Sequence, residues 1–156
     1  MADSVEKAME WVSQVKDFSQ SMVVIAGSRG GGKTPLVKLL AEKGLGTYVN
    51  LSLALSRYRM TVDPANDVGW PSDFMASLLS SVGSDTTLIL DNIEAVFQPE
   101  LRLNPLSWFL QMAREIPLVV VWPVPVLDGE FVFSMPNRQD YFRQRDQSVV
   151  VVNIDA

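Results

Sequence analysis

A glycine-rich segment, GSRGGGKT at residues 27–34, constrains the fold of this chain more than any other feature. It matches the phosphate-binding loop pattern G-x-x-x-x-G-K-[ST]. A short apolar run at 22–26 precedes it, and apolar residues at helical spacing follow it over 35–43. Strand, glycine loop and helix is the order that such a loop requires. The sequence therefore predicts an α/β fold built around a phosphate site, although a glycine turn that binds nothing is the simpler alternative.

The residues of this loop have distinct expected roles toward a nucleoside triphosphate. Backbone N–H groups would surround a phosphate at the N-terminus of the helix, where the helix dipole favours an anion. Lys33 is expected to reach the β- and γ-phosphates, and the Thr34 hydroxyl is expected to help hold Mg²⁺. The predicted cofactor-binding residues are Gly27, Ser28, Arg29, Gly30, Gly31, Gly32, Lys33, Thr34 and Pro35.

Composition narrows the chemistry that is open to this chain. Its 156 residues suit a single domain over 1–156. It has no Cys and no His, which excludes disulfides and the usual zinc ligands and general base. The net charge of −5 argues against strong binding of nucleic acid by bulk charge. Neither a membrane span nor a secretion signal is apparent, so a cytoplasmic protein is expected.

Strand and helix patterns alternate along the rest of the chain. The expected helices cover 4–18 (an amphipathic helix), 35–43, 71–82 and a segment from 104, and the expected strands cover 22–26, 47–51, 86–91, 117–122 and 148–154. Residues 52–60 fit a helical turn or a loop, a hairpin is expected around 128–129, and a brief helix over 137–145. The alternation predicts a mainly parallel five-stranded sheet flanked by helices, with the phosphate loop at its carboxyl edge.

The strand at 86–91 ends in an acid, Asp91, which fits the acid that supports Mg²⁺ in P-loop NTPases. An ordinary strand whose Asp caps the next element is the alternative. Asn92 occupies the position at which many related ATPases carry Glu; its amide can orient a water but cannot accept the proton of that water. Glu94 is the nearby carboxylate that could do so, unless it is a solvent-facing helix residue.

Further residues are candidates for the remaining parts of an ATPase site. Arg143 and Arg145 precede the last strand, where AAA+ ATPases place an arginine that reaches the neighbouring subunit. They could equally form a solvated face, or a weak nucleic-acid contact beside Tyr141. The strand that ends at Trp122 lacks the polar sensor residue of related ATPases. The sequence also has no helical lid after its last strand, so we expect an AAA+-like core whose site is completed by another subunit.

The combination of motifs resembles BrxF, the small P-loop ATPase family of type III BREX phage-defence systems. The resemblance rests on GSRGGGKT, on VNLSLALS at 49–56 and on LILDNIEAVFQPELRLNPL at 88–106, with support from the strand end at 121–123 and the closing valine strand. It implies an ATPase that uses ATP and Mg²⁺ and works with other BREX proteins, among them a larger ATPase, a PglZ-type protein and a DNA methyltransferase. The nucleotide residues of the family correspond here to Gly27, Gly32, Lys33, Thr34 and Asp91.

The expectation from sequence is thus an AAA+-like, weakly hydrolysing ATPase that assembles into a homo-oligomer or with larger partners. DNA contact is expected to be weak or indirect, and no membrane contact is expected. Two alternatives remain open at this stage. Asn92 and the missing sensor favour a nucleotide-binding assembly module without turnover. A small-molecule kinase shares the P-loop, but no insertion here resembles the arginine-rich lid of such enzymes.

Overall fold

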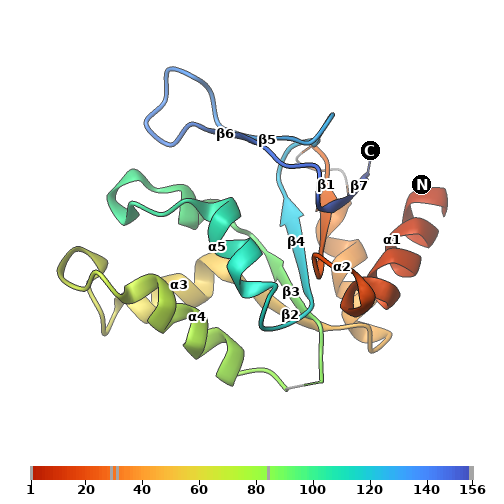
Figure 1. The fold of residues 1–156 in the computed structure, drawn as a ribbon, viewed down its shortest axis with the longest axis horizontal. Helices are drawn as coiled ribbons and strands as arrows, with labels where there is room; N and C mark the ends of the chain where they lie inside the picture. Colours follow the sequence, from red (N-terminus) through yellow and green to blue (C-terminus); the bar gives the residue numbers. More distant parts are fainter. Residues whose placement is uncertain (1, 29, 31, 84, 155–156) are drawn as a thin grey trace.

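The computed structural model describes residues 2–28, 30, 32–83 and 85–154. Its centre is a parallel sheet in the order β2-β3-β4-β1-β7, with helices on both faces (Figure 1). The strands of this sheet are β1 (Met22–Ala26), β2 (Thr47–Asn50), β3 (Leu88–Asp91), β4 (Leu118–Trp122) and β7 (Val150–Asn153). The helices are α1 (Ala2–Gln14), α2 (Lys33–Glu42), α3 (Leu51–Arg59), α4 (Trp70–Ser80) and α5 (Pro105–Met112), and the 3-10 segments are η1 (Val15–Asp17), η2 (Pro64–Asn66), η3 (Glu94–Phe97) and η4 (Pro99–Leu101).

Successive residues of the sheet strands point to opposite faces of the sheet, and each face packs into its own hydrophobic core. α1 and α2 cover one face, where Val23, Ile89 and Val119 are fully buried. α3, α4 and α5 cover the other, where Val24, Leu90 and Val120 are equally buried. Because β1, β3 and β4 are buried on both faces, their sequences are nearly continuous apolar runs. The predicted five-stranded parallel sheet is therefore confirmed.

The ambiguous segment after β2 is helical. α3 begins at Leu51, and the side chain of Asn50 caps it by accepting a hydrogen bond of 3.0 Å from the Leu53 N–H. The apolar side chains of Leu51 and Leu55 are buried against the sheet. None of the helices among the described residues is long and apolar enough to cross a bilayer.

The predicted helix over 137–145 is wrong. Residues 142–145 instead form strand β6 (Phe142–Arg145), which pairs antiparallel with β5 (Glu130–Phe133). Side chains alternate along β6, so that Phe142 stacks edge-on against Phe97 with ring centroids 5.6 Å apart, while Arg143 is exposed. This period of two is the pattern of a strand, and the apolar contact stabilises it over a helix.

The predicted turn at 128–129 is present, but the residues before it do not form a strand that pairs with β5. Asp128 and Gly129 both have positive φ, at 57° and 73°, and a single bridge joins Leu127 to Glu130. The main partner of β5 is β6. The two strands form a ribbon that lies beyond the carboxyl end of β4 and supplies the connection to β7 (Figure 1).

The ribbon is tied to the sheet by the side chain of Asn153, at the end of β7. Its amide nitrogen donates to the Val126 carbonyl at 2.8 Å, and its carbonyl oxygen accepts from the Val126 N–H at 2.9 Å. Val126 is buried. The amide thus satisfies both backbone groups of a residue that has left the sheet.

Asn153→Leu is expected to lower the free energy of unfolding by about 2 kcal/mol, because it leaves both buried backbone groups of Val126 without a partner. Urea denaturation followed by circular dichroism measures the change. Asn137→Leu, in the exposed loop of the ribbon, is the control and should leave the midpoint unchanged. Equal midpoints for both variants would show that Asn153 does not hold the ribbon.

Candidate nucleotide-binding site

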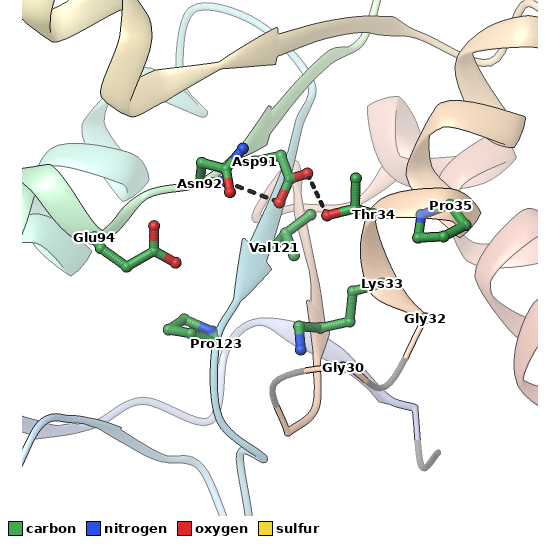
Figure 2. A pocket seen from close by; sticks show the side chains of 10 residues that line it. All are labelled: Gly30, Gly32, Lys33, Thr34, Pro35, Asp91, Asn92, Glu94, Val121 and Pro123. Carbon is green, nitrogen blue, oxygen red and sulfur yellow. Dashed lines mark hydrogen bonds between the residues drawn. The ribbon is translucent and has the colours of Figure 1, made fainter.

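A cavity of about 490 Å³ opens at the carboxyl ends of β1, β3 and β4 (Figure 2). Parallel α/β sheets bind ligands at this edge. The residues that line the cavity come from the glycine loop, the start of α2, the end of β3 and the end of β4. They are Gly30, Gly32, Lys33, Thr34, Pro35, Asp91, Asn92, Glu94, Val121 and Pro123.

Two glycines of the loop are needed for different reasons. A Cβ on Gly27 would lie 2.3 Å from the carbonyl oxygen of Ile154, which runs alongside the end of β1. Gly32 caps the N-terminus of α2 with a φ of 89°, which side-chain-bearing residues rarely adopt. The predicted loop residues Arg29 and Gly31 lie outside the described residues.

The side chain of Lys33 is folded along the glycine loop. Its Nζ donates to the carbonyl oxygens of Gly27 and Ser28, each at 2.7 Å, and only 8% of the residue is exposed. The ammonium group is thereby held at the wall of the cavity, which the first residues of α2 also line. Both features favour a bound anion, and a phosphate fits this combination.

Asp91 is the buried acid of the site, with 3% of its surface exposed. Its Oδ2 accepts a hydrogen bond of 2.8 Å from Thr34 Oγ1, and its Oδ1 accepts one of 2.9 Å from the Asn92 N–H (Figure 2). A hydroxyl and a carboxylate are hard oxygen ligands of the kind that Mg²⁺ prefers. Among the described residues no group of three or more His, Cys, Asp or Glu side chains that could hold a metal ion is found.

Asn92 and Glu94 both line the cavity, so the structure brings the two predicted water-orienting residues to the same cavity as the glycine loop. Asn92 has a φ of 53°, in the left-handed region where Asn is tolerated. Glu94 starts η3, and its carboxylate extends toward the cavity (Figure 2). The end of β4 contributes Val121 and Pro123 to the lining, and both side chains are apolar.

Arg143 and Arg145 lie on β6 and do not line this cavity. Arg143 Nε is 3.1 Å from Glu130 Oε2 across the ribbon, and 62% of its side chain is exposed. Arg145 is also exposed. Neither arginine is therefore placed to act on a phosphate in its own chain, and their action on a neighbouring subunit stays a prediction.

Sequence reasoning missed Tyr48, on β2. Its hydroxyl donates a hydrogen bond of 2.8 Å to Asp91 Oδ2. Burial raises the pKa of the Tyr48 phenol above its ordinary value, and the hydrogen bond and negative charge of Asp91 raise it further, so the hydroxyl stays a donor. No motif marks this residue. The signal was that β2 and β3 end at the same edge of the sheet, with Tyr48 paired with Ile89, two residues before Asp91.

Sequence reasoning also missed Ser52, in the first turn of α3. Its Oγ donates to the Asn92 carbonyl and accepts a hydrogen bond of 3.2 Å from the Ala95 N–H. Its backbone N–H also donates to the Asn92 carbonyl, at 2.9 Å. Ser52 thus holds the segment that carries Asn92 and Glu94 against α3.

Comparisons with known proteins agree with the fold. No family model matches the chain, and no curated protein matches it. Among solved structures, that of PCH-2 from C. elegans is similar, with a TM-score of 0.53 at 13% sequence identity. The match covers 96% of this chain but 42% of the PCH-2 chain. At this identity the likeness shows the fold alone, an α/β fold with a five-stranded parallel sheet flanked by helices.

Ser52→Ala is expected to lower the free energy of unfolding by about 1–2 kcal/mol, because two hydrogen bonds to the segment after β3 are lost. Amide hydrogen exchange should also become faster at Ala95. Ser56→Ala, one turn further along α3 and exposed, is the matched control. Unchanged exchange at Ala95 would show that Ser52 does not hold the segment.

Proposed function

We propose that this chain binds ATP with Mg²⁺ and hydrolyses it weakly, as an AAA+-like ATPase whose site is completed by assembly. The observation that carries the proposal is the arrangement at one cavity of the glycine loop, Lys33 and the hydrogen-bonded pair of Thr34 and Asp91. P-loop NTPases use these groups at these places to hold phosphates and the metal ion. The similarity to PCH-2 supports the fold on which such a site is built.

Each residue of the cavity has a definite part in this function. Backbone N–H groups at the start of α2 and the ammonium group of Lys33 bind the phosphates. Thr34 and Asp91 would hold Mg²⁺, which neutralises phosphate charge when bound. The carboxylate of Glu94 can orient a water and accept its proton, whereas the amide of Asn92 can only orient it.

Weak turnover by the isolated chain follows from what the cavity lacks. Val121 and Pro123 give no polar contact at the end of β4. Phosphoryl transfer gains greatly from a second positive charge near the γ-phosphate. Arg143 and Arg145, which are exposed on the ribbon, are our candidates to supply this charge to a neighbouring copy in a homo-oligomer.

The resemblance to BrxF supports a more specific role. We assign the chain to a cytoplasmic BREX assembly that acts against phage DNA, in which a larger ATPase is the first candidate partner. Direct DNA contact would be weak, since the net charge is −5. The sequence motifs carry this part of the proposal, and the likeness to PCH-2 adds nothing to it.

A nucleotide-binding assembly module without turnover is the second candidate function. Asn92 favours it, because that residue stands where many related ATPases carry the catalytic Glu, and its amide cannot accept a proton. Phosphate release measured with saturating ATP separates the two functions. Sustained release that depends on Mg²⁺ supports the ATPase, whereas binding without release supports the module.

Lys33→Ala is expected to weaken ATP binding at least about 10-fold, because the cavity-lining ammonium group proposed to bind the phosphates is removed. Isothermal titration calorimetry with ATP and MgCl₂ measures the affinity. Lys43→Ala, at the exposed C-terminal end of the same helix, is the control and should bind as the wild type does. Equal affinities for the Lys33 variant and the wild type would refute the assignment of the phosphate site.

Assembly is tested by light scattering with and without ATP and MgCl₂. We expect the mass to rise to a defined oligomer when nucleotide is present. In that state, Arg143→Ala or Arg145→Ala should reduce phosphate release about 10-fold or more while ATP binding is kept. Arg138→Ala, in the exposed loop of the ribbon, is the matched control. A monomer at saturating ATP would contradict self-assembly and leave a partner protein to complete the site.

A further inference from the structure

The hydroxyl of Tyr48 contacts the site residue Asp91, but Tyr48 does not line the cavity. Its hydroxyl lies 2.8 Å from Asp91 Oδ2, the same oxygen that accepts from Thr34. Tyr48 itself is described by the structure but is not among the 10 residues that line the cavity. A ligand in the cavity would therefore meet Asp91, and Tyr48 would act on that ligand only through Asp91.

Three donors fix the orientation of the Asp91 carboxylate. The hydroxyls of Thr34 and Tyr48 both donate to Oδ2, and the backbone N–H of Asn92 donates to Oδ1. A carboxylate has about four acceptor positions, so within the described residues these bonds leave about one, on Oδ1. Without Tyr48 only a single donor would hold Oδ2, and the carboxylate could rotate more freely.

Tyr48 is itself held by two other elements. Its strand, β2, is paired in parallel with β3, which carries Asp91. The Nζ of Lys38 lies 5.4 Å from the centroid of the Tyr48 ring, a cation–π distance. Lys38 belongs to α2, the helix that begins with Lys33 and Thr34. The tyrosine thus connects the strand of the acid to the helix of the phosphate loop.

We propose that Tyr48 is a positioning residue, which orients Asp91 toward Mg²⁺ and so sets the Mg²⁺ concentration at which the site binds nucleotide tightly. The inference rests on the proposed function, because it requires a nucleotide with Mg²⁺ in the cavity. Groups that orient a metal-binding side chain commonly change metal affinity 10- to 100-fold when they are removed, roughly the range expected here. A tyrosine that only supports the sheet edge would have no such selective effect.

The test uses Tyr48→Phe, which removes the hydroxyl and keeps the ring. Binding of a fluorescent ATP analogue (mant-ATP) is measured in EDTA and over a range of MgCl₂ concentrations. We expect the MgCl₂ midpoint to rise about 10-fold, with affinity in EDTA equal to that of the wild type. Tyr58→Phe is the matched control, because the Tyr58 ring packs against Phe74 in the core, with centroids 5.0 Å apart. It should keep the wild-type midpoint.

The remaining outcomes contradict the inference, and they show whether the proposed function fails with it. An unchanged MgCl₂ midpoint in the Tyr48 variant overturns it while the proposed function stands. An equal loss of affinity with and without MgCl₂ also overturns it, since Tyr48 would then support the loop as a whole. A wild-type protein that binds mant-ATP in neither condition overturns the proposed function, and the inference with it.

A second measurement does not depend on the folding of the Tyr48 variant. The chain has three tyrosines, so 3-fluorotyrosine labelling gives three fluorine signals, which Tyr58→Phe and Tyr141→Phe assign. Adding MgCl₂ to the ATP-saturated protein should shift the signal of Tyr48 and leave that of Tyr58 in place. A Tyr48 signal that does not respond to MgCl₂ would overturn the inference.

Discussion

The burial of one carboxylate, Asp91, is the constraint on which the site depends. An ionised group that is only 3% exposed is costly unless hydrogen bonds replace its lost water. Here the replacements come from α2 through Thr34, from β2 through Tyr48 and from the backbone of Asn92. Three separate parts of the chain must therefore reach their positions before the acid is satisfied. The geometry of the site around the Asp91 carboxylate therefore depends on the completed fold.

The connection between the parallel strands β4 and β7 is unusual. Parallel strands are commonly joined by a helix, yet here a two-stranded ribbon provides the crossover. The ribbon is stabilised by aromatic packing instead: the rings of Phe97 and Phe133 stack with centroids 4.0 Å apart, and Trp122 meets Phe131 edge-on. Asn153 joins this layer to β7. Arg143 and Arg145 are consequently carried on β6, beyond the sheet.

The sequence predicted the parts of the site whose geometry is local. The spacing from Gly27 to Thr34 is set by the loop itself, and the apolar run before Asp91 is set by burial on both faces of the sheet. Strand β6 was not predictable in this way, because four residues rich in Arg form a strand only when β5 and the ring of Phe97 lie against them. Tyr48 was missed for the same reason, since its partner is 43 residues away.

The distribution of charge in the cavity is one argument behind the proposed assembly. Among the described residues that line it, Lys33 alone carries a positive charge, whereas Asp91 and Glu94 are acidic. A nucleoside triphosphate brings several further negative charges, and Mg²⁺ offsets only part of them. The side formed by Val121 and Pro123 offers no compensating dipole from a side chain. In the proposed function, a cation supplied by another subunit would stabilise the transition state, and turnover would depend on assembly.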